Sequence, residues 1–122
     1  MLIVEFLKQL EIKMLARHAN QLLNLLERVA DVGCAEVTKV MVLHWYSQER
    51  MTVGVWRDLQ EKWEEVLEQT GNERTIPLLV GDAPGLWVLV WGQGLKEVDE
   101  TAWLKDVAGL SKRKVEEAQL TA

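Results

Sequence analysis

Two short apolar segments separated by a glycine- and proline-rich turn restrict the fold of this chain most strongly. Residues 76–80 and 86–91 read Ile-Pro-Leu-Leu-Val and Leu-Trp-Val-Leu-Val-Trp, and they flank Gly-Asp-Ala-Pro-Gly at 81–85. Apolar runs of this length bounded by Gly and Pro predict two strands joined in a hairpin. Both segments are apolar on both faces, whereas only one face of a sheet meets the helices in a two-layer domain. Each face of the hairpin must therefore be covered or used for binding.

The first 30 residues predict a long helix. No Gly or Pro occurs between Leu2 and Ala30, and residues that favour helices dominate this stretch. Gly33 follows and is suited to a C-terminal cap. An apolar seam with alternating spacings of four and three runs along the second half: Leu15, Ala19, Leu22, Leu26 and Val29. The seam either packs only on the chain's own core or also serves a second contact.

The segment 37–46 is compatible with two structures. Its β-branched and aromatic content predicts a strand, which we favour. A helical face is the alternative, since five side chains also keep helical spacing: Val37, Val40, Met41, His44 and Trp45. Residues 47–50 are polar and would turn the chain into a second strand at 51–56, where the central Gly54 disfavours a helix.

Two further helices complete the predicted order. Residues 57–69 form an amphipathic pattern with one apolar stripe: Leu59, Trp63, Val66 and Leu67. Helical spacing returns near the C-terminus: Leu95, Val98, Ala102, Trp103, Val107 and Leu110. We therefore predict a single domain, 1–122, of the α+β class. An antiparallel sheet of about four strands packs against a long N-terminal helix, a middle helix and a C-terminal helix.

Composition narrows the classes of function. The chain has 122 residues, of which 48% are hydrophobic and 27% charged, as in ordinary globular domains. The apolar runs are far shorter than a bilayer requires, and charges interrupt the N-terminal segment, so we expect neither a membrane span nor a secretion signal. The single cysteine, Cys34, fits a reducing compartment, and we expect a cytoplasmic protein. The net charge of −5 weighs against a nucleic-acid partner without excluding a local basic patch.

No catalytic, metal or cofactor motif stands out in the sequence. The candidates for nucleophilic catalysis are Cys34, His18 and His44, and none lies in a motif with a base or an orienting group. Paired Cys or His residues at zinc-ligand spacing do not occur. The turn at 81–85 joins two strands instead of opening a helix, so it does not cradle a phosphate. We therefore expect a non-enzymatic protein with no cofactor.

Tryptophan is the unusual component, with six residues against one Phe and one Tyr. Trp63 and Trp103 lie on apolar helical stripes, and we expect both in the core. Trp87, Leu89 and Trp91 share one face of their strand. If that face is uncovered, it is a partner-binding surface, because Trp is enriched among interface anchors. If helices cover it, the three side chains are core.

The stretch 75–107 carries the first of two resemblances. It contains the hairpin, then the apolar link Gly-Gln-Gly-Leu at 92–95, then an acidic turn that opens the helix, Lys-Glu-Val-Asp-Glu-Thr-Ala-Trp-Leu-Lys-Asp-Val at 96–107. This resembles the C-terminal half of class I type III secretion chaperones, which have similar length, acidity and element order. The likeness covers about a quarter of the chain. The first half departs from the family, which has a shorter helix and usually three strands.

That resemblance implies a homodimer that grips an extended segment of a partner protein. The dimer contact would lie on the middle helix, at Leu59, Trp63, Val66 and Leu67. The gripping surface would include Trp87, Leu89 and Trp91.

Residues 103–115 carry the second resemblance. They read Trp-Leu-Lys-Asp-Val-Ala-Gly-Leu-Ser-Lys-Arg-Lys-Val, which is similar to the Gly-Leu-Ser turn and recognition helix of a helix-turn-helix. With 76–91 as a wing and 37–46 as a helix, it implies a winged-helix DNA-binding regulator that uses the 103–120 region. Lys112, Arg113 and Lys114 would contact phosphates or bases. The alternative for these three residues is a solvated terminal helix.

The two resemblances differ at residues 37–56. A strand pair there favours the chaperone-like arrangement, and two helices favour the winged helix. The sequence thus predicts a protein-binding module with a homodimer as its expected state, and DNA binding is the alternative.

Overall fold

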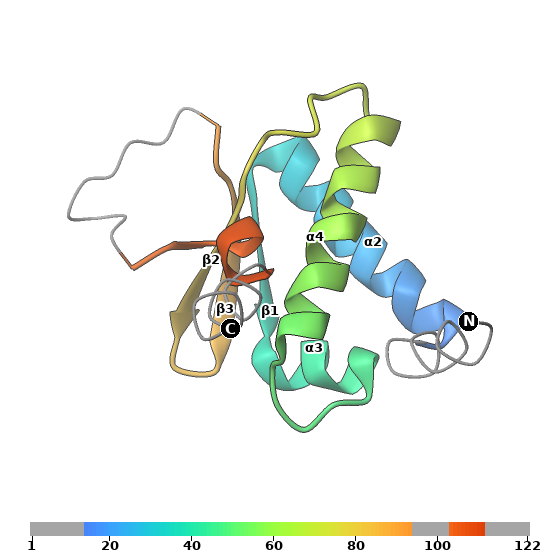
Figure 1. Cartoon of the computed structure of the whole chain (residues 1–122), viewed down its shortest axis with the longest axis vertical. Helices are drawn as coiled ribbons and strands as arrows, with labels where there is room; N and C mark the ends of the chain where they lie inside the picture. Colours follow the sequence, from blue (N-terminus) through green and yellow to red (C-terminus); the bar gives the residue numbers. More distant parts are fainter. Residues whose placement is uncertain (1–13, 94–102, 112–122) are drawn as a thin grey trace, which may run out of the picture.

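The protein is an α+β domain in which helices pack on one side of an antiparallel sheet (Figure 1). The structure is a computed structural model that describes residues 14–93 and 103–111. In chain order the elements are α2 (Ala16–Val32), β1 (Cys34–Thr38), α3 (Lys39–Tyr46), α4 (Val53–Gln69), β2 (Leu78–Ala83), β3 (Leu86–Trp91) and β4 (Lys105–Asp106). This confirms the predicted fold class.

The sheet has four strands in the order β1-β3-β2-β4, and all of its pairs are antiparallel. The predicted hairpin is confirmed: β2 and β3 pair along their whole length around the turn at Pro84 and Gly85. Gly85 adopts a positive φ of 84°, and its N–H donates to the Asp82 carboxylate. Turn chemistry and apolar content thus specify the same hairpin.

Helix α2 ends where the sequence predicts. Gly33 adopts the left-handed conformation, and its N–H donates to the carbonyl of Val29. The seam is buried at Leu22, Leu26 and Val29, while Leu15 is exposed. Residues 2–13 of the predicted helix lie outside the described residues.

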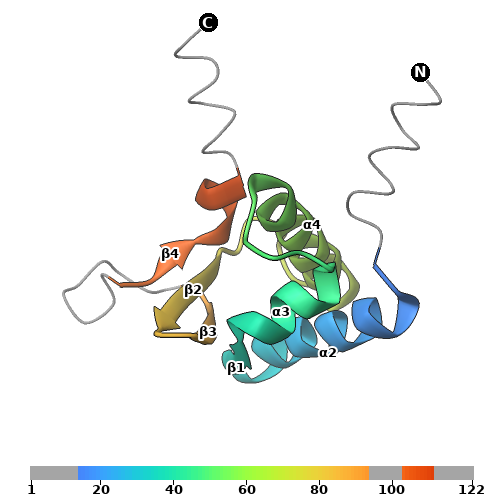
Figure 2. The same ribbon diagram turned by 90° about the horizontal axis from the view of Figure 1, so that it is seen from below.

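The strand predicted over 37–46 is wrong beyond Thr38. Strand β1 stops there, and α3 begins at the next residue, because the Thr38 hydroxyl accepts the N–H of Met41 as an N-terminal cap. Helical spacing then turns Val42, Trp45 and Tyr46 into the core. Burial of one helical face outweighs the β propensity of this run, as tertiary packing commonly does. Figure 2 shows α3 lying alongside α2.

The strand predicted over 51–56 is also wrong. Thr52 caps α4 by accepting the N–H of Val55, and the helix runs from Val53 to Gln69. Gly54 is tolerated in its first turn. The 37–56 segment therefore contains two helices instead of a strand pair, and the predicted helix 57–69 is the C-terminal part of α4.

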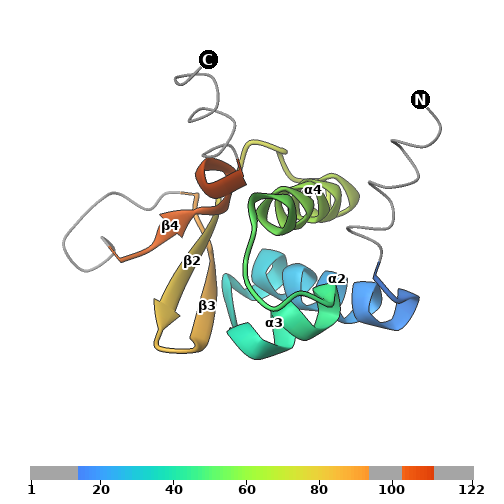
Figure 3. The same ribbon diagram turned by 60° about the horizontal axis from the view of Figure 1, so that its bottom comes forward.

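The last predicted helix is interrupted in the part that the structure describes. Residues 105–106 form β4, which pairs with Leu79 and Val80, and 107–111 are helical. The Arg57 guanidinium donates to the carbonyl of Ser111 at 3.5 Å, which links this short helix to the start of α4. Figure 3 shows the two side by side.

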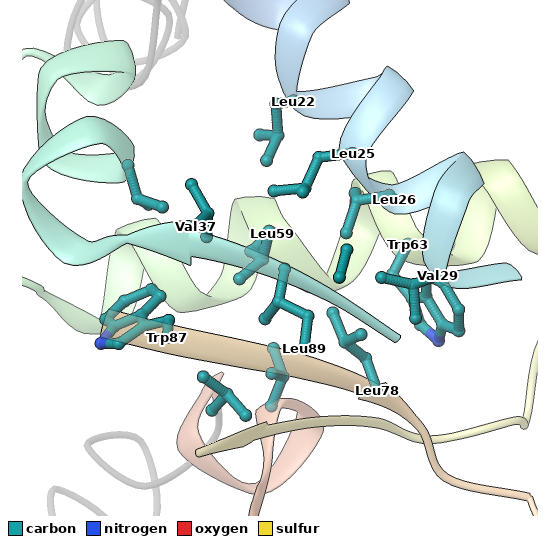
Figure 4. Packing of buried hydrophobic residues seen from close by; sticks show 14 of the residues in the cluster. Leu22, Leu25, Leu26, Val29, Val37, Leu59, Trp63, Leu78, Trp87 and Leu89 are labelled. Atoms are coloured by element: carbon teal, nitrogen blue, oxygen red, sulfur yellow. The ribbon is translucent and has the colours of Figure 1, made fainter. Parts of the chain in front are cut away.

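The core lies between the helices and one face of the sheet (Figure 4). The register places Ala35, Val80 and Leu89 on that face, where α2 and α4 cover them. Trp63 is fully buried, as expected, and its indole N–H donates to the carbonyl of Ile76. Among the described helices, none combines the length and the apolar character needed to span a bilayer.

Candidate functional site: a tryptophan-lined cleft

The cleft is built on a pair of stacked indoles. Trp87 comes from the helix-facing side of β3 and is 3% exposed, whereas Trp56 comes from the first turn of α4 and is half-buried. Their ring centroids are 5.3 Å apart and the ring planes differ by 15°. Offset stacking at this distance is a favourable aromatic arrangement. The stack bridges the helical layer and the sheet.

A third indole stands over Gly81. Trp103 precedes β4 and remains 48% exposed. A side chain at position 81 would collide with Cζ3 of the Trp103 ring, and the neighbouring ring carbons lie within 2.5 Å of the place a Cβ would take. Glycine at 81 is therefore needed for Trp103 to lie where it does. The expectation that Trp103 is core was wrong.

Two lysines and an aspartate supply the polar groups of the cleft. Lys39 is the first residue of α3, and its backbone N–H donates to the carbonyl of Gly85 at the hairpin tip. Lys105 lies on β4 opposite Val80. Asp82 lies opposite Trp87 and binds the turn through its carboxylate. Neither lysine forms an ion pair with any residue that the structure describes.

The cleft has a volume of about 470 Å³. Its lining consists of Lys39, Met51, Trp56, Val80, Asp82, Trp87, Trp103, Lys105 and Leu110. This size and the mixture of aromatic walls with a few charged groups are typical of ligand-binding sites in proteins. The two lysines against one aspartate give it a positive charge on a chain of net charge −5.

The predicted partner-binding face is the covered face of the sheet. Trp87 and Leu89 are buried, and Trp91 is half-buried with its ring edge-on to Trp63 at 6.0 Å. Of the two alternatives that the sequence left open for this strand face, the structure has the core. Trp87 nevertheless reaches the wall of the cleft at the open end of this face.

The stripe of α4 predicted as the dimer contact is also buried within the single chain. Leu59, Trp63, Val66 and Leu67 are at most 1% exposed within one chain, since α2 and the sheet already cover this stripe of α4. Side chains with no accessible surface cannot form a second contact without unfolding. Lys112, Arg113 and Lys114 lie outside the described residues.

The groups considered for catalysis are dispersed. Cys34 is exposed on β1, and His18 and His44 contact each other away from it, on α2 and α3. Across residues 14–93 and 103–111, no three His, Cys, Asp or Glu side chains gather as metal ligands.

A buried polar network joins α3 to α4. The Tyr46 hydroxyl donates to Asp58 at 2.7 Å, and the same carboxylate oxygen accepts from Lys62 at 2.7 Å. Burial, and then the charge of Asp58, raise the pKa of Tyr46 far above its usual range. A phenol held in its protonated form is suited to joining α3 to α4, and we assign this network a structural role.

The sequence missed most of the cleft. The sequence predicts Trp56 in a strand and Trp103 in the core, and no pattern in it points to Lys39 or Lys105. Their sequence separations are large, so no local pattern groups them. The excess of tryptophan was the available signal, together with a glycine inside β2.

Comparison with known proteins gives no matching family model, no matching curated protein and no matching solved structure.

Proposed function

We propose that this protein is a non-enzymatic protein-binding module that holds a short segment of a partner protein in the tryptophan-lined cleft. The observation that carries the proposal is the cleft itself, in which three indoles from α4, β3 and the segment before β4 converge. Tryptophan side chains provide large apolar contact area at little entropic cost, and they dominate binding energy at protein interfaces.

The charges of the cleft favour an acidic partner segment. Lys39 and Lys105 have no ionic partner among the described residues, and Asp82 is already engaged by the hairpin turn. A carboxylate placed between them gains charge-assisted hydrogen bonds, while an apolar neighbour contacts the indoles. We therefore propose a segment that alternates acidic and apolar side chains.

The winged-helix alternative gains support from the element order but not from the surface charges. Two helices at 37–56 are the outcome that favours it, while the residues that would contact DNA in it, Lys112, Arg113 and Lys114, lie outside the described residues. The exposed positions of α4, however, include Glu61, Glu65 and Glu68 against Arg57. Acidic side chains repel phosphates. We therefore propose that this arrangement of helices and hairpin serves protein binding, since one fold supports unrelated functions.

The chaperone-like form of the proposal is weakened, because 37–56 is not a strand pair. A homodimer remains a proposal and would need a surface other than the buried stripe of α4. The cytoplasm remains the proposed compartment on the evidence of the single cysteine.

Fluorescence anisotropy with labelled short peptides tests the proposal. The probe alternates Glu with Leu and Phe, and its partner peptide has Lys in place of every Glu. We expect the wild-type chain to bind the acidic peptide and not the basic one, with affinity falling as salt is added. The double variant Lys39→Glu, Lys105→Glu should reverse this preference.

The matched control reverses two exposed charges of α2 outside the cleft, Arg17→Glu and Arg28→Glu. It leaves peptide discrimination largely intact if the cleft is the site. Equal binding of both peptides, or equal effects of the two double variants, would refute the proposal. Binding of duplex DNA at low salt, lost on charge reversal in the cleft, would favour the alternative instead.

A further inference from the structure

The two histidines of the chain contact each other although they lie far apart in sequence. His18 is in the first turn of α2 and His44 is in the last turn of α3. Their ring centroids are 4.9 Å apart, and the ring planes are tilted by 53°. The contact of α2 with α3 thus brings the whole histidine content of the chain to one place.

The ring nitrogens of this pair are unengaged within the described residues. No hydrogen bond or ion pair joins either imidazole to another described side chain or backbone group. His18 is only 8% exposed, and its Nδ1 is buried with no hydrogen-bond partner. Buried polar atoms without a partner are uncommon and costly, and they call for an explanation. His44 is exposed, so the pair is reached from solvent.

We propose that His18 and His44 together bind a divalent transition-metal ion such as Zn²⁺ or Ni²⁺. Imidazole nitrogens bind these ions at about 2.0–2.1 Å, which puts two ligating rings at a tetrahedral angle about 5 Å apart, centre to centre. The observed separation of 4.9 Å matches that spacing. Imidazole is also the side chain that suits this class of ion.

The remaining coordination positions belong to water. No third His, Cys, Asp or Glu of the described residues joins the pair. A two-imidazole site with water ligands is open and reversible, unlike a closed structural zinc site. Its ion would link α2 to α3, and this inference is independent of the peptide cleft.

Isothermal titration calorimetry of the full chain, without an added histidine tag, tests the site with ZnCl₂ and NiCl₂ in turn. We expect one ion per chain, and His44→Gln should weaken the affinity at least about tenfold because one of two chelating nitrogens is lost. His44 is exposed, so this variant should fold.

Cys34→Ser is the matched control, because a thiolate is a strong ligand for the same ions and this cysteine is exposed. It lies beyond the opposite end of α2, about 20 Å from His18 at 1.5 Å per residue. The affinity of the Cys34→Ser variant for the ion should match that of the wild-type chain. The imidazole signals in nuclear magnetic resonance provide a second measurement that needs no variant at the buried His18. Zinc should shift the signals of both rings; a shift in one ring alone, or undiminished affinity in His44→Gln, would overturn the proposal.

Discussion

At the scale of single residues, Gly81 determines the shape of the cleft. The Trp103 ring occupies the space that any side chain at 81 would need. We expect Gly81→Ala to displace the ring and to lower the free energy of unfolding by about 1–3 kcal/mol, the usual cost of overpacking. Urea denaturation measures the loss, and tryptophan fluorescence reports the displaced ring.

Gly109→Ala is the matched control for this prediction. Position 109 is helical, its φ is not positive, and no atom lies within 4 Å of an added Cβ. Alanine there should leave stability unchanged or raise it slightly. Equal effects at the two glycines would show that Trp103 does not depend on Gly81.

Tyr46 predicts a response to alkaline pH. Because burial raises its pKa in the folded state, the folded chain keeps this proton while the unfolded chain releases it near the ordinary value of 10.0. Below pH 10 the ionisation of Tyr46 does not lower the free energy of unfolding. Above pH 10 that free energy falls as the pH rises, by at most about 1.4 kcal/mol per pH unit.

Tyr46→Phe should flatten this dependence. The variant should also be less stable at neutral pH by about 1–3 kcal/mol, since Asp58 loses a buried donor. Urea denaturation over a pH series compares the two proteins, and the ionisation of lysines cancels in the difference. Parallel pH profiles would mean that Tyr46 ionises normally in the folded chain.

At the scale of elements, two threonines decide where helices replace the predicted strands. Thr38 and Thr52 each accept the N–H of the residue three positions later, which starts α3 and α4. The β-branched runs that follow them predict strands locally. The helices form because Val42, Trp45 and Val55 then reach the core. The signal for a helix in the sequence is the threonine before each of these β-branched runs, because its side chain can cap a helix.

Removal of one cap tests this account. Thr52→Ala should lower the free energy of unfolding by about 1 kcal/mol, because the first turn of α4 loses a hydrogen-bond acceptor. Thr75→Ala is the control, since Thr75 is exposed and accepts no such bond among the described residues. Thermal unfolding followed by circular dichroism compares the two variants. Equal unfolding midpoints would show that the Thr52 cap does not stabilise α4.

At the scale of the whole molecule, the sequence predicts the fold class and the ends of several elements better than it predicts the tryptophan-lined cleft. The positions of glycine and proline in the sequence are enough to predict the hairpin, the end of α2 at Gly33 and the end of α4 at Gln69. The cleft depends on tertiary contacts, because Trp56, Trp87 and Trp103 come from elements that meet only after folding. For the same reason, periodicity identified the stripe of α4 but could not tell a dimer contact from the chain's own core.

The stack of Trp56 on Trp87 spans the boundary between the helical layer and the sheet. Unfolding separates these two layers, so whatever fills the cleft is released when the domain opens. Occupancy and global stability are therefore thermodynamically linked, and a bound segment raises the unfolding midpoint in proportion to the logarithm of its concentration above its dissociation constant. If a partner segment binds in the cleft, the intrinsic fluorescence of the two stacked indoles should change with its occupancy.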